Sequence, residues 1–246
     1  MVKGYYKQIE GVRLPVWIYP AEGEKKFSDT LILCIHGGGW YAVKNNEDWD
    51  GGWMRYQAEY YSGKGFCAAV ISYRSIDFSE NTSVLDQIED CLDAVEYLKE
   101  KTGFKKLVLM GDSAGAQLSA MLTFKNPELA AAAVLCSLVA DCTGEKWAYL
   151  GEEETRKSIS PLYAATGTKT KYIVMHGEQD TVAQMSAVLD FLDNMRKKGN
   201  DCKFIPIPSV GHAFILKGYV SDDESLCRYM SEIDSFLEKN ILEGET

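Results

Sequence analysis

The stretch KLVLMGDSAGAQ, residues 106–117, joins a strand pattern to a helix through a tight turn. Residues 106–110 form a short apolar run, typical of a strand buried on both faces. We expect a helix from Ser113 onward. Between the two lies a GxSxG pentapeptide, residues 111–115, and a serine on such a turn needs small neighbours because the adjacent backbones come close. The stretch predicts a nucleophilic Ser113, although a serine N-cap after a glycine turn would give the same letters.

The same alternation of strand and helix continues on both sides of this stretch. Helices are predicted at about 82–101, 182–198 and 222–240, and in the first of these the apolar residues recur at three- and four-residue spacings. Further apolar runs predict buried strands at 31–35, 67–72, 132–138, 172–176 and 202–207. Strands that alternate with helices indicate an α/β fold, a mostly parallel sheet with helices on both faces.

Two segments depart from this alternation. Residues 3–9 and 12–19 alternate apolar with polar side chains around a Glu10-Gly11 turn, which predicts an antiparallel hairpin at a sheet edge. Residues 139–171 have weaker periodicity, and we interpret them as a small insertion at the carboxyl edge of the sheet. The chain is expected to form one domain over residues 1–246, without a large cap.

Composition excludes several classes of partner. The chain has 246 residues, 46% of them hydrophobic, and its 36 acidic against 26 basic side chains give a formal charge of −10. Such a surface repels nucleic acids and anionic membranes at long range. The N-terminus lacks the pattern of a signal peptide, and several of the seven cysteines lie in apolar runs, so we expect a cytoplasmic protein with no disulfides.

A second glycine motif follows the first buried strand. Residues 36–40 read HGGGW, and successive glycines let backbone N–H groups turn toward a ligand without steric cost. An oxyanion hole requires such N–H groups, and the same run completes the hole in lipases and esterases. A flexible glycine turn is the alternative, but HGGGW and GDSAG each follow a predicted strand, in this order, which favours a hydrolase site.

Few residues can serve as the general base, because the chain has three histidines. His36 belongs to the glycine motif and His176 ends a predicted strand, so both are expected to be structural. His212 follows the last predicted strand and remains the candidate base for Ser113. The orienting acid should precede it in sequence, after the preceding strand. Asp180 is preferred there, with Glu178 and the more distant Asp141 as competitors.

The motifs HGGGW, GDSAG, SPLY, HGEQD and GHAF, in this order, resemble the α/β-hydrolase superfamily, and within it the small esterases related to the hormone-sensitive lipase group. The resemblance covers nearly the whole chain from Leu31 onward. It implies Ser113 as nucleophile, His212 as base and Asp180 as orienting acid. It further implies an eight-stranded sheet whose second strand runs antiparallel, and an oxyanion hole formed by the backbone N–H groups of Gly38, Gly39 and Ala114.

The sequence departs from the larger relatives ahead of the HGGG strand, where they carry a helical cap. The chain is therefore expected to have an open site. The loop from Trp40 to Trp53 is rich in aromatic residues, and Trp40 and Trp49 are predicted to contact the substrate. Trp53 is expected instead to pack in the core, on an amphipathic helix starting near Asp50.

The sequence therefore predicts a serine carboxylesterase that hydrolyses small short-acyl esters, such as acetylated sugars or phenolic esters, through an acyl-enzyme. An arylformamidase of the kynurenine type is the alternative, since that group is also capless, but Gly39 stands where its loop carries an aromatic residue. A binding protein on the same fold is a remote alternative, because such proteins are expected to lack a triad member. No cofactor or metal is expected, and exposed aromatic residues around the site would permit a homodimer.

Overall fold

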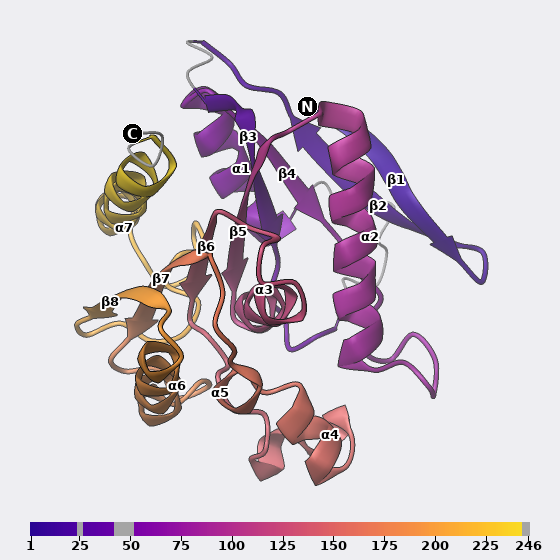
Figure 1. Ribbon diagram of the computed structural model, residues 1–246, viewed down its shortest axis with the longest axis vertical. Helices are drawn as coiled ribbons and strands as arrows, with labels where there is room; N and C mark the ends of the chain where they lie inside the picture. Colours follow the sequence, from indigo (N-terminus) through magenta and orange to yellow (C-terminus); the bar gives the residue numbers. More distant parts are fainter. Residues whose placement is uncertain (24–26, 42–51, 243–246) are drawn as a thin grey trace.

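An eight-stranded sheet with the strand order β1-β2-β4-β3-β5-β6-β7-β8 forms the centre of the molecule in the computed structural model (Figure 1). The structure describes residues 1–23, 27–41 and 52–242. The strands are β1 Val2–Ile9, β2 Val12–Tyr19, β3 Phe27–Ile35, β4 Phe66–Ile71, β5 Lys106–Asp112, β6 Ala132–Cys136, β7 Lys171–Gly177 and β8 Asp201–Ile207.

The predicted hairpin and the antiparallel second strand are both confirmed. β2 pairs antiparallel with β1 and with β4, while every other pair of neighbouring strands is parallel. β1 lies at the edge of the sheet, where one strand face can meet water. The carboxyl ends of β3, β5, β6, β7 and β8 consequently share one edge of the sheet, and the motifs found in the sequence follow four of these strands.

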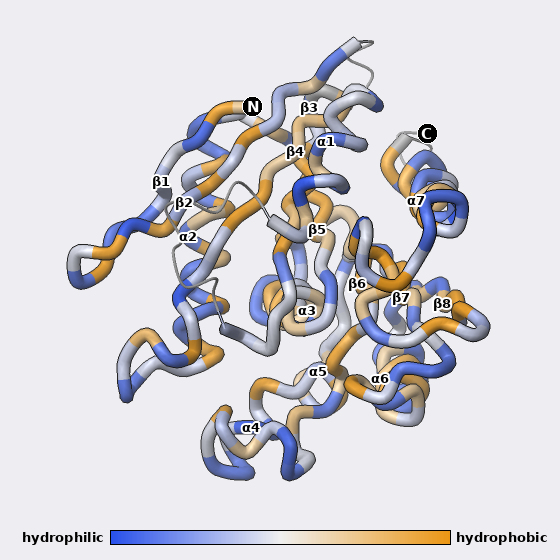
Figure 2. Tube along the Cα trace, turned by 180° about the vertical axis from the view of Figure 1, so that it is seen from behind, coloured by the Kyte–Doolittle hydropathy of each residue, from blue (hydrophilic) through white to orange (hydrophobic). Residues whose placement is uncertain are grey.

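Helices cover both faces of the sheet, as predicted for the α/β fold. One face packs against α2 (Val84–Thr102), α3 (Ala114–Lys125) and α6 (Met185–Lys197), and the other packs against α1 (Arg55–Gly63) and α7 (Asp223–Leu237) (Figure 1). None of the described helices is both long and apolar enough to span a membrane. Figure 2 shows the hydropathy behind this arrangement, with apolar central strands and helices that mix polar and apolar residues.

Local sequence signals set where these elements begin and end. α2 begins after a capping box in which the Ser83 hydroxyl accepts from the Asp86 N–H, and it ends at Gly103 in the left-handed conformation. The last predicted helix ends as α-helix at Leu237 and continues as one π-helical segment, Glu238–Leu242. β6 stops at Cys136, two residues earlier than predicted, because Ser137 adopts φ 49° and leaves the strand.

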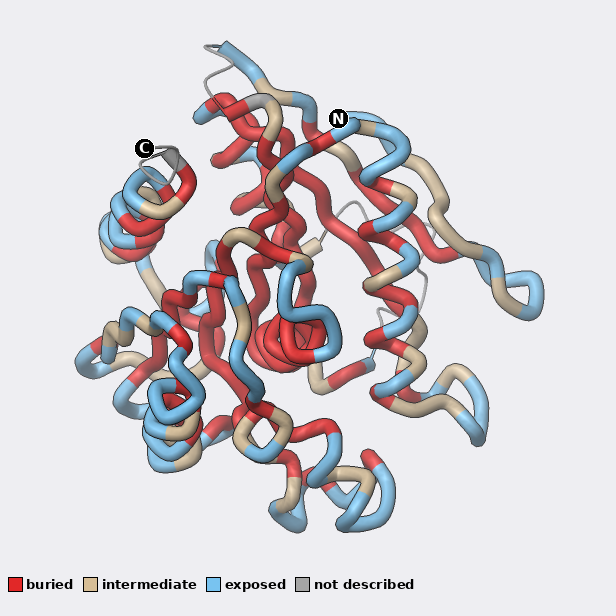
Figure 3. The backbone as a smooth tube through the Cα atoms, in the orientation of Figure 1, coloured by how far each residue is buried: buried red, intermediate tan, exposed pale blue. Residues whose placement is uncertain are grey.

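The helix α3 differs from the others because it is buried along nearly its whole length. Every residue from Ala114 to Phe124 is buried, and Figure 3 shows it enclosed by other elements. A helix that is apolar on all sides belongs in the interior. Its N-terminus, directly after β5, is therefore held rigidly at the carboxyl edge of the sheet.

The segment between β6 and β7 forms three short helices, η2 (Glu145–Leu150), α4 (Glu153–Ser158) and α5 (Pro161–Ala164). It is tied to α3 by a buried hydrogen bond, in which the Gln117 side chain donates to the Ile159 carbonyl at 2.7 Å. Within the segment, the Ser160 hydroxyl accepts from the Cys142 N–H at 2.8 Å. Pro161 occupies the first turn of α5, where a proline is favoured. This segment carries Trp147, which lines a cavity together with Ser113.

Candidate active site

Ser113 lies at the sharp turn between β5 and α3 that the GxSxG motif predicts. Its φ is 57°, in the left-handed region that a serine rarely adopts, and its N–H donates to the Cys136 carbonyl at 2.9 Å. A Cβ on Gly111 would lie 2.2 Å from the Gly115 carbonyl oxygen, and one on Gly115 would lie 2.0 Å from that of Ile35. Any side chain at either glycine would therefore break the turn.

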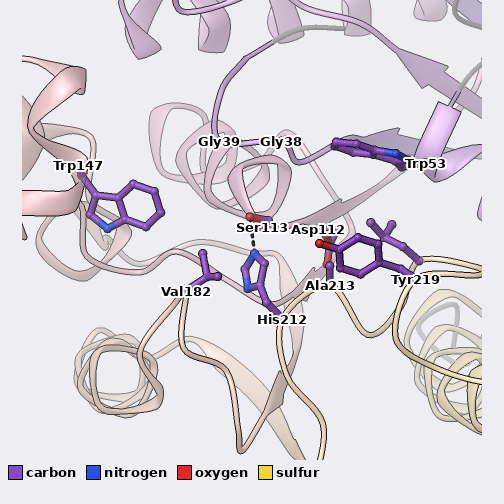
Figure 4. Close-up of a pocket in the computed structure, with 11 residues that line it drawn as sticks. Gly38, Gly39, Trp53, Asp112, Ser113, Trp147, Val182, His212, Ala213 and Tyr219 are labelled. Atoms are coloured by element: carbon purple, nitrogen blue, oxygen red, sulfur yellow. Dashed lines mark hydrogen bonds between the residues drawn. The ribbon is translucent and has the colours of Figure 1, made fainter.

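The structure brings Ser113, His212 and Asp180 together, although they are far apart in the sequence. The Nε2 of His212 lies 2.8 Å from the Ser113 Oγ (Figure 4). The Nδ1 of His212 lies 2.7 Å from the Asp180 Oδ2. The two nitrogens of one imidazole thus face a hydroxyl on one side and a carboxylate on the other. This arrangement can take a proton from Ser113 and hold the resulting imidazolium.

Backbone hydrogen bonds fix the Asp180 carboxylate opposite His212. Its Oδ1 accepts from the N–H groups of Val182 and Ala183, both at 2.8 Å, which also explains why α6 begins at Met185, three residues later than predicted. Burial would raise the pKa of Asp180, but the hydrogen bonds from His212 and Ala183 outweigh burial and lower it. Asp180 is ionised at neutral pH.

The competing acids lie elsewhere. Glu178 is exposed, whereas Asp180 is buried. The Oδ1 of Asp141 accepts from the N–H and the hydroxyl of Thr143, in a local turn. Neither carboxylate has a hydrogen bond to His212 in the described part of the chain.

The other two histidines are completely buried. Burial lowers the pKa of His36 to about 4, and its ring stacks on Tyr73 at 4.3 Å between centroids. The Nε2 of His176 lies 2.8 Å from the Ala183 carbonyl, and burial also lowers the pKa of His176. Both histidines are therefore neutral near pH 7. Among the described residues, no group of three or more His, Cys, Asp or Glu side chains is placed to hold a metal ion.

The HGGG loop lies beside Ser113, at the end of β3. Gly38 and Gly39 line the same cavity as Ser113 and adopt φ values of 97° and 64°. Ala114 is the first residue of α3, and the first N–H groups of a helix have no acceptor within it. The structure therefore gathers the three residues expected to form an oxyanion hole around Ser113.

The cavity at Ser113 has a volume of about 210 Å³. Trp147 and Val182 lie on one side of the Ser113–His212 pair, and Trp53 and Tyr219 lie on the other (Figure 4). Aromatic side chains thus line the cavity on both sides of this pair. Drug-sized ligands usually occupy pockets of roughly 300–1,000 Å³, so this cavity suits a small group.

Two expectations about the tryptophans are wrong. Trp40 is completely buried and does not line the cavity; its Nε1 donates to the Gln117 Oε1 at 2.9 Å, and its ring meets Trp147 edge-on at 5.3 Å. Trp53, expected in the core, is 50% exposed and lines the cavity. The helix in fact begins at Arg55 after a 3₁₀ turn, which leaves Trp53 ahead of the amphipathic segment. Trp49 lies outside the described residues.

Four further residues line the cavity without having been singled out in the sequence: Trp147, Val182, Leu216 and Tyr219. They come from the inserted segment and from the loops that carry Asp180 and His212. Val182 lies shortly after Asp180, and Leu216 and Tyr219 lie shortly after His212, so their position in the sequence could have pointed to these three residues. Trp147 lies in the inserted segment, where the sequence gives no such signal.

Asp112, the second residue of the GDSAG motif, adds a second carboxyl to the cavity. It is 1% exposed, and its Oδ1 has no hydrogen-bond partner among the described residues. Burial raises the pKa of Asp112 from 3.8 to about 7, against opposing effects of His212 and of a hydrogen bond from Ser137. The carboxyl is therefore partly protonated at neutral pH.

This raised pKa makes the stability of the fold depend on pH. Between about pH 4 and pH 7 the folded chain retains a proton on Asp112 that the unfolded chain has lost, so stability falls as the pH rises through this window. Because asparagine does not titrate, we expect Asp112→Asn to raise the melting temperature relative to the parent chain more at pH 8 than at pH 5. Calorimetry at both pH values checks this, with the exposed Asp190→Asn as control; an equal change at both pH values would contradict it.

Comparison with known proteins agrees with this geometry. The BD-FAE family model matches residues 17–134, a little under half of the chain. No curated protein matches the chain by sequence.

Solved structures of esterase 2 from the planctomycete Thermogutta terrifontis are similar over nearly the whole chain. The form phosphoramylated by tabun has 26% identity and a TM-score of 0.80, with 97% of this chain and 94% of that chain covered. The form phosphorylated by paraoxon has 27% identity and a TM-score of 0.80, with 97% and 93% covered. The propionate-bound form has 26% identity and a TM-score of 0.79, again with 97% and 93% covered. The chain belongs to the α/β-hydrolase superfamily and is similar to its small bacterial esterases.

Proposed function

We propose that the protein is a serine carboxylesterase that hydrolyses small, short-acyl esters through an acyl-enzyme. The observation that carries the proposal is the continuous chain of contacts from the Ser113 Oγ through the His212 imidazole to the Asp180 carboxylate, at 2.8 and 2.7 Å. Similarity to a bacterial esterase supports the same reaction.

The reaction follows from this arrangement. The Ser113 Oγ attacks the ester carbonyl while the His212 Nε2 takes its proton, and the developing oxyanion is held by the N–H groups of Gly38, Gly39 and Ala114. His212 then protonates the leaving alcohol, and the acyl group remains on Ser113. Water repeats the cycle, with His212 taking its proton, and releases the carboxylic acid. Asp180 keeps the His212 Nδ1 protonated throughout.

The size of the cavity supports a short acyl group. A volume of about 210 Å³ must hold the reacting carbonyl and whatever lies next to it, between Trp147 on one side and Trp53 on the other. Propionate binds to the similar esterase 2, and a comparable acid product fits the proposal here.

A series of p-nitrophenyl esters from acetate to octanoate tests the proposed function. We expect kcat/KM to fall steeply beyond butyrate, because longer chains exceed the cavity. Absence of turnover on every ester by the folded protein would contradict the esterase proposal.

Arylformamides are the second candidate substrate, because aromatic side chains line the cavity on both sides of the Ser113–His212 pair. The rate on N-formylkynurenine, compared with that on p-nitrophenyl acetate, separates the two. A higher kcat/KM on the formamide would assign the protein as an arylformamidase.

Gly38→Ala tests the oxyanion hole. The added Cβ would lie 3.0 Å from the Trp53 Cζ3 and 3.3 Å from the Tyr41 carbonyl oxygen, at a φ of 97° that alanine disfavours. The loop must shift, and loss of one oxyanion donor costs about 10²–10³ in kcat. We expect a loss of this size in kcat, measured with p-nitrophenyl acetate.

The matched control is Gly63→Ala at the end of α1, where the added Cβ meets no atom within 4 Å. This variant should keep the parent activity. Equal activity of both variants would contradict the role of Gly38.

A further inference from the structure

Ser137 occupies the junction between the elbow that carries Ser113 and the loop that carries His212. It directly follows β6, is completely buried and adopts φ 49°. Its N–H donates to the Met175 carbonyl of β7 at 3.0 Å, and the carbonyl of the preceding Cys136 accepts from the Ser113 N–H at 2.9 Å. The backbone at residues 136–137 therefore holds β7 and the nucleophile turn together.

The Ser137 hydroxyl extends this junction to the histidine loop. Its Oγ accepts from the Ala213 N–H at 3.0 Å, and Ala213, directly after His212, is itself held at φ 59°. The Ser137 hydroxyl also acts on the Asp112 carboxyl, whose pKa it lowers against the larger effect of burial. One hydroxyl has one proton to donate and lone pairs to accept, so Ser137 can serve both neighbours at once.

We propose that Ser137 is a positioning residue for the reaction, whose hydroxyl holds the backbone directly behind His212 through the Ala213 N–H and so aims the imidazole at the Ser113 Oγ. This inference rests on the proposed function. Three non-glycine residues in the left-handed region, Ser113, Ser137 and Ala213, meet at this point, and strained residues persist where the surroundings determine them.

Removing the hydroxyl leaves one buried group without its partner. The Ala213 N–H loses its acceptor, and an unpaired buried N–H is costly. The loop can recover a hydrogen bond only by moving, and a movement of His212 lengthens its 2.8 Å contact with Ser113. Proton transfer is slowed, while Trp53 and Trp147, which lie on other segments, still line the cavity.

Ser137→Ala and Ser137→Gly test the proposal together. Glycine also lacks the hydroxyl and adopts a positive φ without steric strain. Ser137→Gly should therefore fold even if Ser137→Ala is strained at this position. For both we expect kcat and the rate of Ser113 phosphorylation by paraoxon to fall by about tenfold to a hundredfold, with KM within about twofold of the parent value. Rates are expressed per active site, counted from the p-nitrophenol that paraoxon releases.

Ser119→Ala is the matched control, since Ser119 is also completely buried and its hydroxyl donates to the Gly115 carbonyl within α3. It should keep the parent kcat. The proposal is overturned if both Ser137 variants keep the parent rate per active site, or if their only change is fewer active sites. Failure of the proposed function appears separately, as no ester turnover by the parent chain, and the paraoxon rates still report on Ser137 in that case.

Discussion

Ser113→Ala is expected to lower kcat on p-nitrophenyl acetate by about a millionfold, the loss seen when the nucleophile of a comparable hydrolase is removed. The Ser113 Oγ is the atom that bonds to the acyl group, and it lies 2.8 Å from the His212 Nε2. No other side chain of the described cavity has a hydrogen bond to this nitrogen. Steady-state rates with highly purified protein check this result.

Backbone strain at Ser113 makes a second variant necessary. Alanine at φ 57° is disfavoured, so a loss of activity in Ser113→Ala could reflect a shifted turn. Ser113→Gly tolerates this φ and also lacks the hydroxyl, so it should be equally inactive with an unchanged circular dichroism spectrum. Residual activity above about one per cent of the parent in either variant would show that another group is the nucleophile.

Asp180→Asn should lower kcat at neutral pH by about 10⁴-fold, the cost of the same change in a serine protease triad. The amide can still accept the N–H groups of Val182 and Ala183 through its oxygen, so the loop keeps its shape. Its NH₂ then faces the His212 Nδ1, which favours the tautomer with the proton on Nε2, and that tautomer cannot accept the Ser113 proton. Steady-state kinetics at pH 7 to 8 measure the loss.

Glu178→Gln is the matched control for this variant. Glu178 lies two residues away, is exposed, and was the competing acid in the sequence. It should keep the parent kcat, because no described contact links it to His212. A larger loss in Glu178→Gln than in Asp180→Asn would reverse the assignment of the acid.

The sequence predicted those parts of the site that local rules specify. GDSAG and HGGGW require small residues in a turn between a strand and a helix, and this requirement is local, so it can be read from a few letters. The preference for Asp180 over Glu178 came from order and spacing, and the structure supplies the reason: Asp180 is buried and held by two backbone N–H groups, whereas Glu178 is exposed.

The walls of the cavity could not be predicted in the same way. Trp40 and Trp53 belong to one aromatic-rich stretch of the sequence, yet one is buried against Gln117 and the other is half exposed at the cavity. Which ring turns inward depends on partners from α3 and from the inserted segment, such as Gln117 and Trp147, which are distant in the sequence. The junction at Ser137 was missed for the same reason, since its hydroxyl accepts from an N–H that lies 76 positions further along the chain.

The identity of the covalently modified residue tests the central claim most directly. The parent chain is incubated with paraoxon, and intact mass spectrometry with peptide mapping locates the adduct. We predict one diethylphosphoryl group per chain, on Ser113, with the release of one equivalent of p-nitrophenol. An adduct on any other residue, or none on the folded protein, would contradict the assignment of Ser113 as the nucleophile of a serine hydrolase.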